Sequence, residues 1–150
     1  MNNANLTVCG VVEMNGGVLL VRHSYGSAKD KLVLPGGFVR QGELPTTAAE
    51  REIFEGTGIT CKAKAVLSVQ FRADQWCTVF VMEQAQGEIR TDSFAISEAV
   101  TLSPEEALSR PDLNDMSREI LSAYLRTCNS EGAKALSRWD NSTNEAVFGV

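Results

Sequence analysis

The stretch of residues 34–59 constrains this chain more than any other part, because it joins a glycine turn, a polar loop and a short carboxylate-rich helix. It reads LPGGFVRQGELPTTAAEREIFEGTGI. Glu43 follows Gly37 after five intervening residues, and after seven more come Arg51 and Glu52. The spacing therefore fixes one carboxylate on the loop and places an arginine and a further carboxylate on the helix behind it.

Glu52 and Glu55 lie three residues apart and so share one face of the predicted helix, where like charges repel by a few tenths of a kcal/mol. A hard divalent cation would remove that repulsion and use the carboxylate oxygens as ligands. The alternative is an ordinary solvated helix face on which Arg51 pairs with Glu55 at four residues' separation. The residues alone leave both interpretations open.

The spacing also resembles the Nudix box, GX5EX7REUXEEXGU, in which U is an apolar residue. The match holds at Gly37, Glu43, Arg51, Glu52, Ile53, Glu55, Gly58 and Ile59. It fails at Gly56, where the family has the second Glu of its EE pair. Other segments resemble Nudix proteins too, so that the resemblance covers about residues 6–125: these segments are 21–26, 34–37, 98–100 and 102–106.

This resemblance implies an α/β (α+β) fold, an α/β/α sandwich whose mixed β-sheet is flanked by helices. It implies hydrolysis of a small-molecule nucleotide, a nucleoside diphosphate linked to another moiety, by water that attacks phosphorus. Mg²⁺ or Mn²⁺ is the implied cofactor, since a metal neutralises the diphosphate and activates water. An acidic chain can bind an acidic substrate in this way.

The resemblance also assigns roles to single residues. The implied metal-coordinating positions are Glu52, Glu55, Glu98 and the backbone carbonyl of Gly36 or Gly37. Glu52 is in addition a candidate catalytic base. Arg51 is expected to hold Glu43 and to orient the loop against the helix. The implied catalytic set is therefore Glu43, Arg51, Glu52, Glu55 and Glu98, with ordinary loop surface as the alternative role for Glu98.

Gly56 leads to two alternative hypotheses about function, because a glycine side chain offers no oxygen to a metal. Glycine also lowers helix stability by up to about 1 kcal/mol relative to alanine. In one interpretation the remaining carboxylates and water still hold the metal, and the enzyme is active but weakened or altered. In the other, catalysis is lost and the domain is a nucleotide-binding or regulatory module. A chance match in an unrelated α+β binding protein is a third hypothesis, which predicts no helix after Gly37.

Candidate substrate contacts precede and follow the glycine turn. His23 is the only histidine, and with Tyr25 it is a candidate for contacting phosphate or stacking on a base. The alternative is a partly buried or exposed pair at the end of a hairpin. Cationic candidates for the phosphates are Arg22, Arg40, Arg72 and Lys31.

Composition limits the other function classes. The chain has 150 residues, net charge −5 and a pI of about 4.9, which argues against nucleic acid and anionic membranes as partners. No signal peptide or membrane-spanning run is evident, so we expect a soluble, cytoplasmic protein. The four cysteines form no CxxC or Cys/His cluster and are expected to be buried thiols. Family analogy leaves room for a homodimer.

Apolar patterns and turn residues predict the elements. We expect an antiparallel pair of strands around the Asn15-Gly16-Gly17 turn, and the box helix beginning at Pro45 in preference to a later start at a Thr47–Glu50 capping box. Gly58 is expected just beyond the helix. The expected strands cover 6–14, 18–23, 32–34, 62–73, 77–84, 87–91 and 96–102, and two further helices cover 104–110, with Ser103 as cap, and 114–127.

The domain is expected to cover 1–127, followed by a C-terminal tail over 128–150. The tail is rich in Ser, Asn and Gly and low in apolar content. It is interpreted as a loose tail, an additional short helix, or an arm packed on the domain or on a partner.

Overall fold

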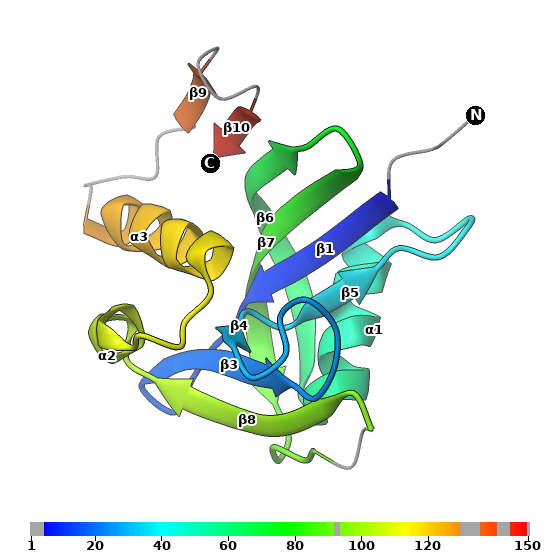
Figure 1. The fold of residues 1–150 in the computed structure, drawn as a ribbon, viewed down its shortest axis with the longest axis vertical. Helices are drawn as coiled ribbons and strands as arrows, with labels where there is room; N and C mark the ends of the chain where they lie inside the picture. Colours follow the sequence, from blue (N-terminus) through cyan, green and yellow to red (C-terminus); the bar gives the residue numbers. More distant parts are fainter. Residues whose placement is uncertain (1–4, 92–93, 130–135, 141–144, 150) are drawn as a thin grey trace.

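A computed structural model describes residues 5–91, 94–129, 136–140 and 145–149 of the chain (Figure 1). The chain contains both strands and helices, as expected for a mixed α and β protein. The strands are β1 (Asn5–Val11), β2 (Glu13–Met14), β3 (Gly17–His23), β4 (Leu32–Val33), β5 (Gly36–Phe38), β6 (Thr60–Phe71), β7 (Gln75–Gln86), β8 (Ile96–Leu102), β9 (Leu136–Asp140) and β10 (Glu145–Gly149). The helices are α1 (Pro45–Thr57), α2 (Pro104–Ser109) and α3 (Asp115–Asn129).

Two four-stranded sheets form the centre of the molecule. The first has the order β5-β1-β7-β6, in which β1 runs parallel to β7 and antiparallel to β5. The second contains β2, β3 and β4, and β8 pairs with β3. The predicted mixed sheet is thereby confirmed, and the strands expected over 62–73 and 77–84 are present as β6 and β7, which pair antiparallel.

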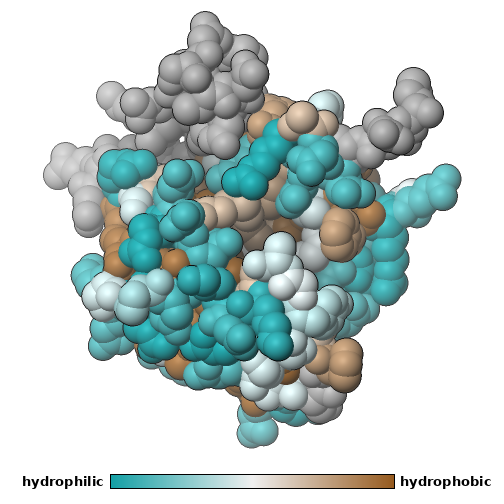
Figure 2. Space-filling model, in the orientation of Figure 1, coloured by the Kyte–Doolittle hydropathy of each residue, from teal (hydrophilic) through white to brown (hydrophobic). Residues whose placement is uncertain are grey.

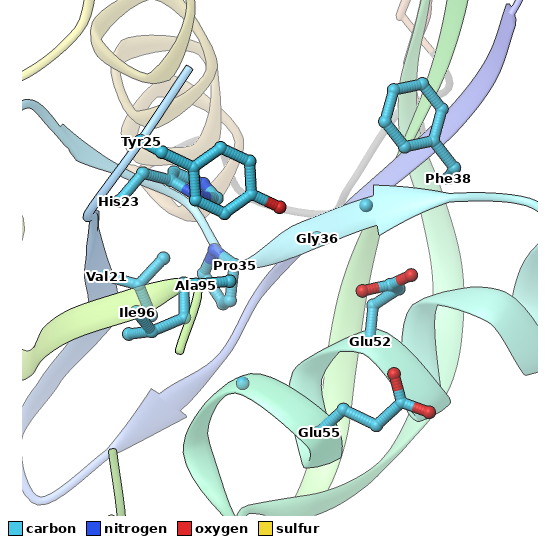
Figure 3. A pocket seen from close by; sticks show the side chains of 12 residues that line it. Val21, His23, Tyr25, Pro35, Gly36, Phe38, Glu52, Glu55, Ala95 and Ile96 are labelled. Atoms are coloured by element: carbon cyan, nitrogen blue, oxygen red, sulfur yellow. The ribbon is translucent and has the colours of Figure 1, made fainter. Parts of the chain in front are cut away.

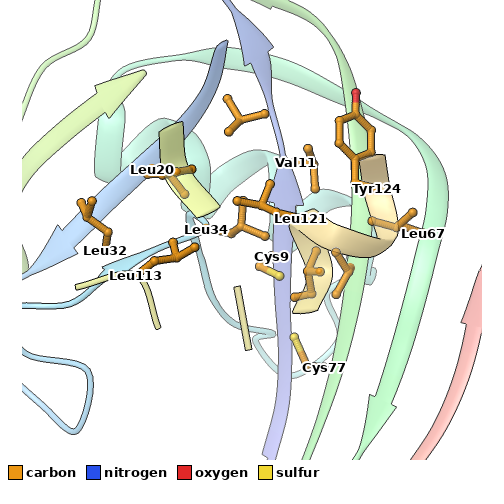
Figure 4. Close-up of a cluster of buried hydrophobic side chains, with 14 residues drawn as sticks. Cys9, Val11, Leu20, Leu32, Leu34, Leu67, Cys77, Leu113, Leu121 and Tyr124 are labelled. Atoms are coloured by element: carbon orange, nitrogen blue, oxygen red, sulfur yellow. The ribbon is translucent and has the colours of Figure 1, made fainter. Parts of the chain in front are cut away.

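Helices cover both faces of the first sheet, which confirms the expected sandwich. On one face Ile53 of α1 packs with Val8 and Phe80. On the other face Leu121 of α3 packs with Cys9 and Val79 in the cluster shown in Figure 4. Alternate residues of β1 and β7 thus serve different cores, because successive side chains of a strand point to opposite faces.

The expected pairing of residues 6–14 with 18–23 is wrong for most of its length. The turn has the predicted positive φ values, 52° at Asn15 and 76° at Gly16, but only β2 pairs with β3 there. β1 ends at Val11 and joins the other sheet beside β7. Its nearly continuous apolar run is typical of a strand buried on both faces, and such a strand lies inside a sandwich rather than in an edge hairpin.

The expected edge strand over residues 87–91 is also wrong. This segment has no strand structure, and Gly87 has a φ of 112°. The Arg90 N–H donates to the Thr57 carbonyl oxygen at 2.8 Å. The chain therefore crosses the end of α1 and gives this donor to the helix instead of to a sheet neighbour.

The box helix has the predicted limits. Pro45 is its first residue, and Leu44 precedes it without a side-chain cap. Gly58 follows the last helical residue with a φ of 77°, and its N–H donates to the Phe54 carbonyl oxygen. The presence of this helix removes the hypothesis of a chance match. The capped start of α2 at Ser103, with Glu106 completing the capping box, is confirmed as well.

α3 extends to Asn129, two residues beyond the predicted domain boundary. After it, β9 and β10 form an antiparallel pair, and β10 lies next to β6. Residues 130–135, 141–144 and 150 lie outside the described part of the chain, and the boundary after residue 127 stays a prediction. Within the described residues, no helix is both long and apolar enough to span a bilayer.

Candidate active site

Arg51 is the centre of a network that joins α1 to the loop after β5. Its Nε and Nη2 donate to both carboxylate oxygens of Glu43, at 2.7 and 2.9 Å, and Nη2 also donates to the Phe38 carbonyl oxygen. Arg51 side-chain bonds and the Arg40 backbone N–H lower the pKa of Glu43 to about 2, and the same pairing raises the pKa of Arg51. The predicted pair of Arg51 and Glu43 is therefore present.

The same guanidinium holds the two helix carboxylates. Arg51 Nη1 donates to Glu52 Oε1 at 2.9 Å and to Glu55 Oε2 at 3.2 Å. Arg40, mostly exposed, lies with Nη2 3.6 Å from the other Glu55 oxygen. Both members of the predicted carboxylate pair thus keep one oxygen directed away from Arg51.

Glu52 and Glu55 line a cavity of about 280 Å³, as Figure 3 shows. The absence of a side chain at Gly37 makes room for the Glu52 carboxylate, because a Cβ at Gly37 would lie 2.3 to 2.7 Å from its carboxyl atoms. The other lining residues are Val21, His23, Tyr25, Pro35, Gly36, Phe38, Gly56, Ala95 and Ile96. Gly36 belongs to this wall as predicted, and its closest neighbours across the sheet are backbone atoms of Val8 and Cys9.

This donor set fits a divalent metal that arrives with its substrate. Two carboxylates face one cavity, and Mg²⁺ is usually bound through one or two carboxylates, waters and substrate phosphates. Among the described residues, no group of three or more His, Cys, Asp or Glu side chains is arranged to hold a metal ion. A metal cage made of protein side chains alone is therefore not formed by the part of the chain that is described.

Gly56 faces the same cavity and leaves space in it. A Cβ at this position would meet only Ile96 Cγ1, at 3.6 Å, which is an ordinary van der Waals contact. Apart from the two chain neighbours of Gly56, no described side chain other than that of Ile96 lies within 4 Å of the position that this Cβ would occupy.

Glu98 does not line the cavity that Glu52 and Glu55 share. The structure therefore does not group the three carboxylates as the resemblance implied. Glu98 is on β8, and its Oε2 accepts from Arg22 Nε at 2.8 Å. Glu98 and Arg22 are a cross-strand pair, whereas their neighbours Ala99 and Val21 pair on the opposite face, and Val21 lines the carboxylate cavity. Because side chains alternate along strands, Glu98 points away from that cavity.

Arg22 likewise makes contacts within the protein. Besides Glu98, it contacts Asp112 through Nη2 at 2.8 Å and donates to the Asp30 carbonyl oxygen. Arg110 contacts the same Asp112 carboxylate, and these two arginines lower the pKa of Asp112. A phosphate contact by Arg22 is not supported, because Arg22 lines neither the carboxylate cavity nor the larger one that shares part of its wall, and three of its five N–H donors bond to Glu98, Asp30 and Asp112.

His23 and Tyr25 are brought to the carboxylate cavity, and both also line a second cavity of about 800 Å³. The two cavities share five residues: His23, Tyr25, Gly36, Gly37 and Phe38. Burial lowers the pKa of His23, so its imidazole is neutral at pH 7. Lys31 and Arg72 line only the larger cavity.

Several wall residues of the larger cavity were not predicted from the sequence. They include Thr7, Gln75, Cys77, Asn114 and Ser117. They come from β1, the start of β7 and the beginning of α3 with the residue before it, so their side chains meet only through the tertiary fold. Phe38 and Ile96 carried a weak signal, since Phe38 follows the double glycine and Ile96 begins a predicted strand.

The fold and the paired carboxylates place the chain in a class of α/β/α proteins that carry acidic residues on a helix after a glycine turn. A family model described as the NUDIX domain matches residues 1–124. The chain therefore belongs to the NUDIX domain family, as the resemblance indicated.

Individual relatives share part of their length with this chain. An ADP-ribose pyrophosphatase of Methanocaldococcus jannaschii is 33% identical over 91 residues, which is 57% of this chain and 54% of that protein. The 8-oxo-dGDP phosphatase NUDT18 of Homo sapiens is 29% identical over 97 residues, 63% of this chain and 30% of that protein. The chain thus spans about half, or less, of these relatives.

Among solved structures, a putative nudix hydrolase family member from Chromobacterium violaceum has a TM-score of 0.70 and is 28% identical. The superposition covers 89% of this chain and 84% of that protein. The likeness therefore extends over nearly the whole domain.

Proposed function

We propose that this chain hydrolyses the diphosphate bond of a nucleoside diphosphate linked to another moiety, with Mg²⁺ or Mn²⁺ bound at Glu52 and Glu55. The observation that carries the proposal is the pair of carboxylates that Arg51 holds on one cavity wall. Family membership supports it, as does the name of the archaeal relative, an ADP-ribose pyrophosphatase.

A bound metal would neutralise diphosphate charge and lower the pKa of an attacking water. Glu52 is the residue that we propose to accept the proton of that water, because it lies in the cavity with only one oxygen held by Arg51. Arg51 fixes the direction of both carboxylates, while Glu43 fixes Arg51. The neutral His23 adds no charge at the cavity wall and is suited to donating a hydrogen bond to substrate.

The cavities have room for a substrate larger than a diphosphate. The larger one shares five wall residues with the carboxylate cavity, and we propose that it holds one end of the nucleotide. Its wall carries the cations Lys31 and Arg72 and the neutral Asn114 and Gln75. This combination suits a polar sugar or base with an anionic group.

Gly56 favours a second candidate, nucleotide binding without turnover. The position lacks a carboxylate and is filled by no other described side chain. In that case the chain would still bind a metal–nucleotide complex at Glu52 and Glu55 and would act as a binding or regulatory module.

One experiment separates the two candidates. Purified protein is incubated with Mg²⁺ or Mn²⁺ and a panel of nucleotide sugars, ADP-ribose, NADH, dinucleoside polyphosphates and oxidised deoxynucleotides, and products are separated by chromatography. Metal-dependent turnover that falls at least about 100-fold in Glu52→Gln supports the enzyme, since removal of a catalytic group commonly costs 10²–10⁴-fold. Binding with no turnover of any compound supports the module.

We further propose a cytoplasmic protein that acts on small molecules and has neither nucleic acid nor membrane as a partner. The net charge of −5 supports the absence of a polyanionic partner. A homodimer is proposed on family analogy alone. Light scattering at several protein concentrations tests this state directly.

A further inference from the structure

Two aromatic side chains beside the carboxylate cavity are unusually exposed. Phe94 is 92% exposed and Tyr25 is 59% exposed. Their rings stack on each other, with centroids 6.4 Å apart and an interplanar angle of 30°. Exposed aromatic area that is grouped and lies next to a cavity is typical of a surface that a ligand covers.

Hydrogen bonds from Ser24 hold together the two backbone segments that carry these rings. Ser24 Oγ donates to the Phe94 carbonyl oxygen at 2.6 Å, and the Ser24 N–H donates to the Ala95 carbonyl oxygen at 3.0 Å. Tyr25 follows Ser24 directly in the chain. The loop after β3 and the loop before β8 are therefore tied together at the point where the rings stack, so the pair is preorganised.

Tyr25 is the member that faces the site. It lines both cavities, and in Figure 3 its ring lies across the pocket from the Glu52 and Glu55 side chains. Phe94 lines neither cavity, so it supports Tyr25 from the outside. Phe38, 62% exposed, is a further aromatic residue of the shared wall.

An aromatic ring at this place suits a planar ligand group. The carboxylates that would hold a metal ion for a diphosphate are on α1, and Tyr25 offers a π-face with one hydroxyl. Bases of every kind stack on such faces. A nucleotide whose diphosphate lies at Glu52 and Glu55 would bring its base close enough to use Tyr25.

We propose that Tyr25, backed by Phe94, is the stacking platform for the nucleobase of the substrate and selects nucleotides over diphosphates that carry no base. The proposal rests on the proposed function in one respect, that the diphosphate binds at Glu52 and Glu55. Phe94 acts as a positioning residue because it contacts Tyr25 and lies outside the cavities.

The test measures binding, so that it does not depend on turnover. Calorimetric titrations in Mg²⁺ use ADP, GDP, CDP, UDP and inorganic diphosphate with the wild-type chain, Tyr25→Ala, Tyr25→Phe and Phe94→Ala. Loss of one stacking contact corresponds to about a 5- to 150-fold rise in Kd for the nucleotides. We expect that rise in Tyr25→Ala, a smaller one in Phe94→Ala, retained affinity in Tyr25→Phe, and unchanged binding of inorganic diphosphate throughout.

Phe54→Ala is the matched control, because Phe54 is a 49% exposed aromatic residue that lines neither cavity. Its nucleotide affinity should equal that of the wild type. The proposal is overturned if the wild type binds none of the nucleotides, if Tyr25→Ala binds them as tightly as wild type, or if it loses inorganic diphosphate to the same extent. Nucleotide binding that needs Tyr25, without turnover of any substrate, would uphold the platform and remove the hydrolase.

Discussion

At position 56 the helix that carries Glu52 and Glu55 has no side chain, and this one residue separates the chain from the box pattern of its family. The backbone there is not left-handed, and a Cβ would make one ordinary contact with Ile96. A larger side chain therefore enters the cavity without a clash at its first carbon.

We predict that Gly56→Glu increases metal affinity and turnover. The added carboxylate joins Glu52 and Glu55 at the cavity, and each added charged ligand strengthens the binding of a hard cation. Mn²⁺ titration by calorimetry or electron paramagnetic resonance should show at least about 10-fold tighter binding, which is about 1.4 kcal/mol. Unchanged Mn²⁺ affinity would mean that the new carboxylate does not reach the metal.

Gly56→Ala is the control for helix propensity. Alanine in place of a helical glycine should raise the free energy of unfolding by about 0.5–1 kcal/mol in urea titrations, with Mn²⁺ affinity unchanged. If Gly56→Ala tightens Mn²⁺ binding as much as Gly56→Glu does, the gain comes from a more rigid helix and not from a ligand.

Local spacing predicted Glu43, Arg51, Glu52 and Glu55 correctly as neighbours, because the loop and helix that carry them are continuous in the chain. It failed for Glu98, whose direction depends on its register with β3. The register shifts between Arg22 and His23, so that Ser97 of β8 is an extra residue, and Ile96 lines the carboxylate cavity whereas Glu98, two residues later, does not. No residue pattern on β8 predicts this bulge.

At the scale of elements, the site depends on how closely β5 approaches α1. The two glycines of β5 serve different neighbours: Gly37 faces the Glu52 carboxylate, while a Cβ at Gly36 would lie 2.0 Å from the Val8 carbonyl oxygen. Gly37 therefore makes room for the Glu52 carboxylate, and Gly36 makes room for the backbone of β1.

We predict that Gly37→Ala and Gly36→Ala have different effects. In Gly37→Ala the flexible end of Glu52 has to move, so turnover should fall at least about 10-fold while the thermal midpoint changes little, because misplacement by about 1 Å can cost 10²-fold. In Gly36→Ala the pairing of β1 with β5 is disrupted, and the thermal midpoint should fall clearly. Equal thermal effects would contradict the separate roles.

The loop and helix are also coupled by the pair of Glu43 and Arg51. The pKa of Glu43 is lowered from 4.5 to about 2, so the folded state is favoured by the ionised form above pH 4.5. This contribution is lost as the pH falls from about 4.5 to about 2. The urea midpoint of the wild type should therefore exceed that of Glu43→Gln at pH 6–7 by an amount that shrinks below pH 4.5. A constant difference down to pH 2 would show that the carboxylate charge is not responsible.

At the scale of the whole molecule, one cluster of charged side chains connects β3 and β8 of the second sheet to the loop between α2 and α3. Arg22 of β3 joins Glu98 of β8 and Asp112 of the loop before α3, and Arg110 joins the same aspartate. Figure 2 shows mostly hydrophilic residues across the lower part of this view of the surface. The network lies outside both cavities, so we assign it to stability.

We predict that Arg22→Met lowers the free energy of unfolding by about 1–2 kcal/mol, between the values for exposed and buried ion pairs, because Arg22 is 19% and Glu98 48% exposed. The KM for substrate should not change. Lys62→Met is the matched control: the Lys62 side chain is 62% exposed and lies 3.6 Å from the Glu50 carboxylate, so the effect of its removal should stay within about 0.5 kcal/mol. A raised KM in Arg22→Met with normal stability would return Arg22 to the substrate site.

The sandwich itself could be expected from the resemblance to the Nudix family, and the helix predicted over 114–127 covers one face of the sheet with the buried Ile120, Leu121 and Tyr124. The neighbouring strands of β1 could not be predicted from the sequence, because its parallel pairing with β7 joins residues about 70 positions apart. The alternation of apolar residues predicts which face of a strand is buried. Which strands lie beside it depends on how all the strands pack around the same core. The larger cavity, built from several such neighbours, was hidden for the same reason.

The central claim, that metal at Glu52 and Glu55 supports diphosphate hydrolysis, is tested most directly by phosphorus NMR of ADP-ribose with Mg²⁺ and ¹⁸O-labelled water. The account predicts that the wild type forms AMP and ribose 5-phosphate with one ¹⁸O in one product, and that Glu52→Gln and Glu55→Gln form them at least about 100-fold more slowly. If the enzyme prefers another linked moiety, the same measurement is made with other nucleoside diphosphate derivatives in place of ADP-ribose. Equal rates in the wild type and both variants, or no cleavage of any diphosphate derivative at saturating metal, would contradict the claim.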